Sequence, residues 1–149
     1  MNYLNKSESA QRRYQRDRQL AELFCEIFDN IKPRRVSQPQ KAALKLALIT
    51  GSPRYHVGFD RAYVVVTQLL NNGNNVTFKS NLTRMMWLEI TKKVKYLMET
   101  GKMSAARAIP IVLENCRASR FFISENQAKR IIRHQLRLMN VLRHYDSAA

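Results

Sequence analysis

Apolar residues recur every three or four positions through most of the sequence, and this spacing is the strongest restriction on the fold. It places apolar side chains along one face of an α-helix, whereas a half-buried β-strand needs alternation at every second residue. The sequence therefore predicts an all-α protein with six main helices. Their expected ranges are about 11–31, 39–49, 59–70, 81–100, 104–113 and 124–144.

The first helix should end before Pro33, because the residue that precedes a proline is disfavoured in the α region. Residues 1–10 form a polar leader that we expect to be flexible. Ser37 and Gln40 flank Pro39 and are expected to cap the second helix. The apolar stripe of the first helix consists of Leu20, Leu23, Phe24, Ile27, Phe28 and Ile31.

The third segment, 59–70, contains the run Val64-Val65-Val66, which also suits a β-strand. We expect a helix, because its larger apolar residues share one helical face. A Gly/Asn cluster at 71–75 then separates two halves of the chain. The predicted organisation is a leader at 1–10, a three-helix unit at 11–73, and a second three-helix unit at 74–149 with a long basic C-terminal helix.

That last helix has the clearest pattern. Ser124 stands three residues before Gln127, which is the spacing of a capping box. The predicted buried face contains Ala128, Ile131, Ile132, Gln135, Leu138, Met139 and Leu142. A second face carries Arg130, Arg133, His134 and Arg137 at helical spacing, as a helix lying along a phosphate backbone would need.

The two halves show the same order of parts when one is set against the other with an offset of 66 residues. The register needs no gap, although few positions are identical. An internal duplication explains this order, and two unrelated helical hairpins remain the alternative. The matched pairs include Arg18 and Arg84, Ala42 and Ala108, Arg54 and Arg120, Ala62 and Ala128, and Leu70 and Leu136.

Each half contains an arginine followed by an aromatic residue, Arg54-Tyr55 in the first and Arg120-Phe121 in the second. The favoured interpretation is structural: the arginine anchors a loop by hydrogen bonding to helix-end carbonyls, and the aromatic ring is buried. A functional role is the alternative. If the halves pack about a twofold axis, residues 55–57 and 121–123 could pair as a tiny two-stranded ribbon.

The segment 52–62 resembles a motif in short basic proteins of phages and mobile elements in Bacteroides-like bacteria, which reads roughly Ser-Pro-Ala-Pro-Arg-Phe-Tyr-Val-Ser. Residues 118–128 repeat it more loosely, and the proline before the arginine is present only in the first half, as Pro53. The resemblance covers about a dozen residues in each half. It implies a genomic setting and no particular activity.

The charge balance restricts the class of partner. The chain has 149 residues, with 26 Lys and Arg against 11 Asp and Glu, a formal net charge of +15. Such an excess repels itself unless an anionic partner neutralises it, and nucleic acid is the commonest such partner. The longest apolar run, 42–49, is interrupted by Lys45 and is too short to cross a bilayer. We therefore expect a cytoplasmic protein, or one packaged in a virion.

No pattern of catalytic residues is present in the sequence. It has no Gly-rich phosphate loop, no Ser/His/Asp or Cys/His arrangement, and no metal-ligand spacing around Cys25 or Cys116. We expect no enzyme activity, no cofactor and no metal site, and we interpret both cysteines as buried thiols.

Two functions of different classes remain. The first is a non-enzymatic nucleic-acid-binding protein, with DNA slightly favoured over RNA, that contacts phosphates through the basic face of the last helix and through Arg12, Arg13 and Arg16. The second is a structural or assembly subunit of a virion or ribonucleoprotein, which associates with itself or with an acidic protein and buries the aromatic residues of the two Arg-aromatic loops. A surface-bound membrane helix ranks third.

Overall fold

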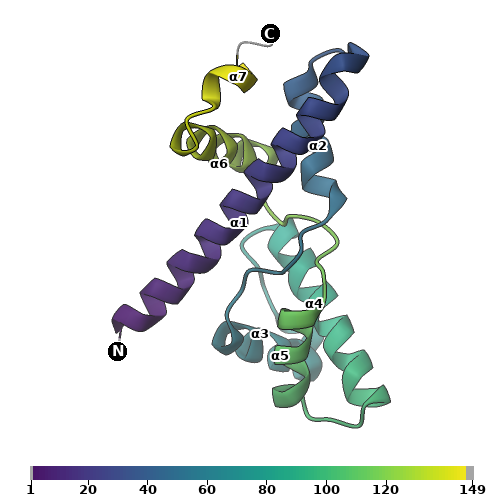
Figure 1. The fold of residues 1–149 in the computed structure, drawn as a ribbon. Helices are drawn as coiled ribbons and strands as arrows, with labels where there is room; N and C mark the ends of the chain where they lie inside the picture. The colour runs from purple at the N-terminus through teal and green to yellow at the C-terminus, as the bar shows by residue number, and fades with distance from the viewer. Residues whose placement is uncertain (1, 147–149) are drawn as a thin grey trace. The chain divides into compact units, whose positions relative to one another are not determined.

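The computed structural model describes the backbone of residues 2–146, and the side chains of residues 8–73 and 75–145. In this described part the protein is all-α, with seven α-helices and two 3-10 helices, as Figure 1 shows. The ribbon expected at 55–57 and 121–123 is not formed within it; isolated bridge residues occur instead at Ser52 and Ala118. The helices are α1 (Asn2–Ile31), η1 (Lys32–Arg34), α2 (Pro39–Thr50), α3 (Phe59–Asn72), η2 (Gly73–Asn75), α4 (Asn81–Thr100), α5 (Ala105–Asn115), α6 (Glu125–Leu138) and α7 (Leu142–Asp146).

Two of the expected boundaries are wrong. Helix α1 begins at Asn2 instead of at Gln11, so the predicted flexible leader is helical; it contains no glycine or proline that would interrupt a helix. The long C-terminal helix is also divided, because α6 ends at Leu138 and α7 starts at Leu142. The intervening turn places Asn140 at a φ of 59°.

The turn after α6 has the hydrogen bonds of a Schellman motif. The N–H of Val141 donates to the carbonyl of Leu136, and the N–H of Asn140 donates to the carbonyl of Arg137, both at 3.0 Å. Asparagine tolerates the left-handed conformation better than most residues, which explains why the helix stops here. Leu138, expected on the buried face, is 56% exposed, whereas Leu136 is buried.

The chain forms two compact units. Unit 1 contains residues 1–52 and 119–149, and unit 2 contains residues 53–118. Helix α6 packs against α1 and α2 in unit 1, while α3 packs against α4 and α5 in unit 2. This division differs from the predicted one at Gly73. The third helix of the first half, α3, lies in unit 2 with α4 and α5, and the third helix of the second half, α6, lies in unit 1 with α1 and α2.

The core of unit 1 is built on the predicted stripe of α1, of which Leu20 and Phe28 are fully buried. Phe121 joins this core, and its N–H donates to the carbonyl of Leu48 near the end of α2 at 3.0 Å. Tyr145 of α7 reaches the same core and contacts the ring of Phe28 edge-on, with 5.3 Å between ring centroids. The turn after α6 thus allows the end of the chain to return to α1.

Unit 2 buries one face of each of its three helices. Trp87, Ile90 and Val94 are the buried residues of α4, at the helical spacing that the sequence predicted. Helix α5 continues through Pro110. Helix α3 keeps its helical conformation across the Val64-Val65-Val66 run, as expected. Its buried residues are Ala62, Val65, Val66 and Leu69.

Candidate nucleic-acid interface

Ser124 fixes the start of the basic helix. Its hydroxyl accepts a hydrogen bond from the N–H of Gln127 at 3.2 Å, which is the predicted capping contact. This bond satisfies one of the N–H groups that a helix start leaves without a partner inside the helix. Glu125 follows in the first turn, where a negative charge is favourable to the helix dipole.

The four predicted contact residues of α6 share the side of the helix opposite its buried residues. Arg130, His134 and Arg137 are exposed, and Arg133 is half-buried. Neither Arg130 nor Arg137 pairs with a carboxylate among residues whose side chains are described. Lys129, which the prediction omitted, is exposed and stands one turn before Arg133. The buried residues opposite them are Ala128, Ile132, Gln135 and Leu136.

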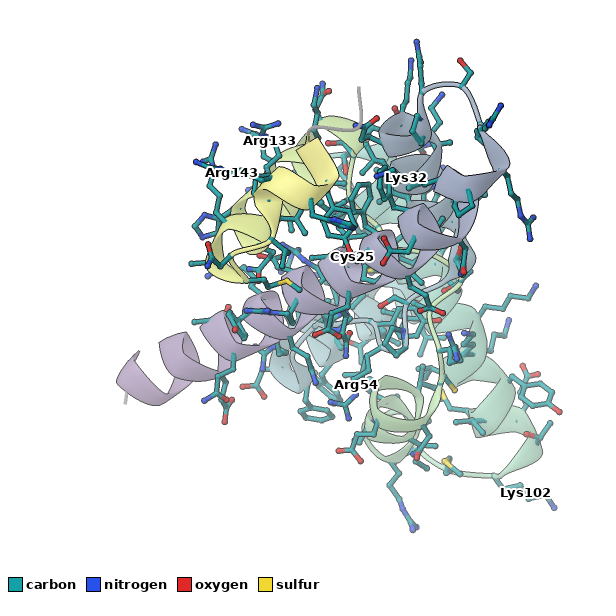
Figure 2. The ribbon with its side chains drawn as sticks, turned by 45° about the horizontal axis from the view of Figure 1, so that its top comes forward. Cys25, Lys32, Arg54, Lys102, Arg133 and Arg143 are labelled. Carbon is teal, nitrogen blue, oxygen red and sulfur yellow. The ribbon has the colours of Figure 1, made fainter. Side chains whose placement is uncertain are left out.

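Arg143 adds a further cation to this end of unit 1. Figure 2 shows the side chains of Arg133 and Arg143 extending outward from α6 and α7. The sequence prediction treated the region as one continuous helix and assigned Arg143 no role. Because a turn separates α7 from α6, the position of Arg143 does not follow from the helical spacing of the cations on α6.

The N-terminal arginines lie in α1, before its buried part begins at Leu20. Arg13 is exposed, whereas Arg12 and Arg16 are half-buried. Arg16 pairs with the neighbouring Asp17, with 2.9 Å between Nη2 and Oδ1. Part of the charge of Arg16 is therefore balanced inside the protein, which makes it the weakest of the three as a phosphate ligand.

The two Arg-aromatic loops belong to different units, and in both the aromatic residue is a core residue. Tyr55 is 5% exposed in unit 2, and Phe121 is 2% exposed in unit 1. The Nε of Arg120 donates to the carbonyl of Phe121 at 3.2 Å, so it anchors its own loop instead of a helix end. Arg54 is exposed. Each ring is therefore already buried within its own unit.

Tyr55 is the centre of a hydrogen-bond network in unit 2. Its hydroxyl donates to Oε2 of Glu89 at 2.7 Å and accepts from Nζ of Lys93 at 2.6 Å. Lys93 also donates to the carbonyl of Arg117 at 2.7 Å, which connects α4 to the segment after α5. Burial, followed by the hydrogen bond to Glu89, raises the pKa of Tyr55 well above its ordinary value.

A second polar cluster joins α7 to α1 in unit 1. The hydroxyl of Tyr145 donates to Oδ2 of Asp29 at 3.2 Å, and His144 Nε2 lies 3.6 Å from Oδ1 of the same carboxylate. Cys25 is half-buried beside Tyr145, and burial is the main reason that the pKa of its thiol is raised. A raised pKa disfavours the thiolate form of Cys25.

Within the described residues, no group of three or more His, Cys, Asp or Glu side chains is placed to hold a metal ion. No helix in that part of the chain combines the length and the apolar character needed to cross a bilayer. Comparison with known protein families, with characterised proteins and with solved structures finds no match to this chain.

Proposed function

We propose that the protein is a non-enzymatic nucleic-acid-binding protein that contacts the phosphate backbone through the basic face of α6. The observation that carries the proposal is the combination of Arg130, His134 and Arg137 on one exposed helical face, with both arginines free of carboxylate partners among the described side chains. A cation without an internal partner gains most from a phosphate and from the counterions that binding releases. The net charge of +15 supports the same class of partner.

Backbone contact is favoured over reading of base sequence. In a helix-turn-helix protein the second helix enters the major groove while the first helix packs beside it. Here the connection between α2 and α3 runs from Gly51 to Gly58, which is longer than the three- or four-residue turn of a helix-turn-helix motif. We therefore expect DNA to be bound with little sequence preference.

The decisive measurement is the affinity for a fluorescent DNA duplex across a series of salt concentrations, repeated with single-stranded DNA and RNA. We expect the logarithm of the affinity to fall linearly with the logarithm of the salt concentration. The double variant Arg130→Gln/Arg137→Gln should make this slope shallower by about 1.8, because each neutralised phosphate contributes about 0.9. Arg133 is left unchanged because it also lines a groove described below.

The matched control is Lys92→Gln/Lys95→Gln on α4, which removes the same charge from two exposed side chains of unit 2. Its salt slope should equal that of the unaltered protein. Equal changes in both variants would mean that net charge alone attracts the DNA. Absence of DNA and RNA binding at low salt would exclude the proposed function altogether.

We also propose that the two halves arose by internal duplication. Helices α3 and α6 begin at Phe59 and Glu125 and end at Asn72 and Leu138, so both boundaries are separated by the same 66 residues as the sequence pattern. The third helix of each half also has an equivalent place, packed on the first two helices of the other half. The motif at 52–62 supports a phage or mobile-element origin. A role as an assembly subunit of a virion is the alternative function.

A further inference from the structure

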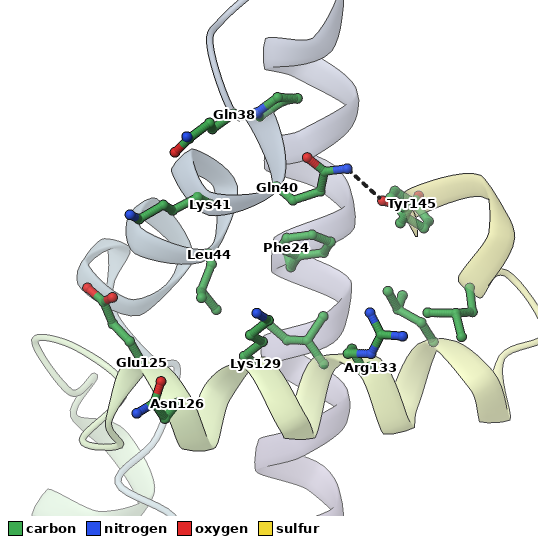
Figure 3. Close-up of a pocket in the computed structure, with 14 residues that line it drawn as sticks. Phe24, Gln38, Gln40, Lys41, Leu44, Glu125, Asn126, Lys129, Arg133 and Tyr145 are labelled. Atoms are coloured by element: carbon green, nitrogen blue, oxygen red, sulfur yellow. Dashed lines mark hydrogen bonds between the residues drawn. The ribbon is translucent and has the colours of Figure 1, made fainter. Parts of the chain in front are cut away.

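Unit 1 contains a groove of about 880 Å³, and its lining includes one of the four predicted contact residues of α6, Arg133. Figure 3 shows it with α1 behind, α2 along one wall, α6 along another and Tyr145 of α7 at one end. Because all four helices belong to unit 1, the groove is a property of this unit alone. Its lining includes Phe24, Leu44, Ile132, Leu136, Leu142 and Tyr145.

The floor of the groove is apolar and continues into the core. Phe24, Ile132 and Leu136 are members of the buried cluster of unit 1, and Leu44 and Leu142 pack against that cluster. Aromatic contact between Phe24 and Tyr145, with 6.0 Å between ring centroids, closes the floor at the α7 end. A ligand that fills this space must therefore offer apolar groups to it.

The walls of the groove carry mainly positive charge. Lys129 and Arg133 extend from α6 over the floor, and Lys41 lies on the α2 wall (Figure 3). Glu125 is the acidic residue of the lining. The groove thus combines an apolar floor with a cationic rim, a pattern complementary to an amphipathic segment whose polar side is acidic.

Two other occupants fit less well. A duplex presents phosphates and sugars on its outside and keeps its bases stacked, so it has no apolar side to place on Phe24 or Leu44. A second copy of this chain has only 11 Asp and Glu against 26 Lys and Arg, and its helices would bring further positive charge to the rim. The cationic rim and the apolar floor of the groove together favour an acidic protein other than this chain as the occupant.

We propose that this groove docks an acidic amphipathic helix of a partner protein. Helix α2 has 12 residues and is therefore about 18 Å long, so about three turns of a partner helix can lie along it. Arg130, His134 and Arg137 are not part of the lining. One helix, α6, then presents one face to a protein and another to nucleic acid, and the protein acts as an adaptor between them.

The test uses a fluorescent synthetic peptide of about three to four helical turns. It carries leucine at positions i, i+3, i+4 and i+7, and glutamate on the opposite side. A scrambled peptide of the same composition is the first control, because it keeps the charge and loses the apolar face. Fluorescence anisotropy with the full chain at physiological salt should show saturable binding of the amphipathic peptide. The scrambled peptide should bind at least about tenfold more weakly.

The groove variant is Lys41→Glu/Lys129→Glu, and the control variant Lys45→Glu/Lys92→Glu changes the same charge at two exposed residues outside the lining. We expect about a tenfold loss of peptide affinity in the first and less than about a twofold loss in the second. Circular dichroism confirms that both variants stay folded. The methyl resonances of Leu44, Ile132 and Leu142 should shift when the peptide binds.

Several results would overturn the proposal: no saturable binding, equal loss in both variants, or equal affinity for the scrambled peptide. Displacement of the peptide by duplex DNA, with greater loss of DNA affinity in the charge-matched variant Lys41→Gln/Lys129→Gln than in Arg130→Gln/Arg137→Gln, would assign the groove to nucleic acid. Docking of the acidic helix is independent of the nucleic-acid function, since the peptide can bind whether or not DNA does, whereas the adaptor role rests on that proposed function.

Discussion

The hydroxyl of Tyr145 donates a hydrogen bond to Asp29 across 116 residues of sequence, and it thereby connects the last helix of the chain to the first. The ring of Tyr145 is 8% exposed and packs edge-on against Phe24 and Phe28. Apolar and polar contacts of a single side chain thus hold α7 at the end of the groove in unit 1.

Tyr145→Phe should keep the ring contacts and remove only the hydroxyl. We expect a decrease of about 1 kcal/mol in the free energy of unfolding, the usual contribution of a hydrogen bond whose acceptor stays accessible to water. Urea denaturation measures this change. Tyr96→Phe is the matched control, because Tyr96 is 65% exposed and its loss of a hydroxyl should change stability very little. Equal effects of both substitutions would contradict the proposed role of the bond to Asp29.

Stability should decrease at alkaline pH because of the two buried tyrosines. Burial and their acidic neighbours raise the pKa of Tyr55 and of Tyr145, so the folded protein keeps phenol protons that the unfolded chain loses near about pH 10. The stabilisation is complete below that pH and is lost as the pH rises above it.

The measurement is urea denaturation at a series of pH values from neutral to alkaline. Tyr55→Phe should be less stable at neutral pH, because Glu89 and Lys93 lose a partner, and should show a shallower alkaline decrease because it has no phenol proton. An unchanged alkaline slope in the variant would contradict the assignment to Tyr55.

Ser124→Ala should destabilise unit 1 by about 1 kcal/mol, because the N–H of Gln127 loses its acceptor at the start of α6. Ser37 provides the control: the sequence predicted it as the cap of α2, yet the residue before this helix is Gln38 and no side chain caps it. Ser37→Ala should therefore leave the midpoint of thermal unfolding within about one degree. A similar loss of stability from both substitutions would contradict the capping role of Ser124.

The division into units makes a prediction about fragments. Residues 53–118 contain all three helices of unit 2 and should give a cooperative thermal transition by circular dichroism, although with the low stability expected for a small domain. Residues 11–73 contain α3 without its partners α4 and α5, and α1 and α2 without α6. This fragment should be helical in part and should unfold without cooperativity. Cooperative unfolding of 11–73 alone would support the division at Gly73 instead.

Local features of the fold could be predicted from the sequence because their causes are local. The cap at Ser124 and the buried stripe of α4 follow from the residue spacing. The helical class follows from the same spacing. The turn at Asn140 was missed because one asparagine in an otherwise helical pattern is a weak signal, and its effect depends on Tyr145 finding a place in the core.

The partners of each helix could not be predicted in this way. Helices α3 and α6 have apolar faces that suit either half of the chain, and the pattern alone does not show which half receives them. The same limit applies to the candidate site. The cationic face of α6 was visible from residue spacing, whereas the groove beside Lys129 depends on α1, α2 and α7 coming together. The nucleic-acid function itself stays a prediction.

The discontinuity of unit 1 has a consequence for protein synthesis. A ribosome releases α1 and α2 early, yet the helix that covers Leu20 and Phe28 is made only after the whole of unit 2 has emerged. Unit 2 can fold during that interval. The apolar stripe of α1 then stays exposed to water or to a chaperone. The synthesis of the segment that contains α6 and α7 therefore sets the time at which the apolar stripe of α1 can be covered.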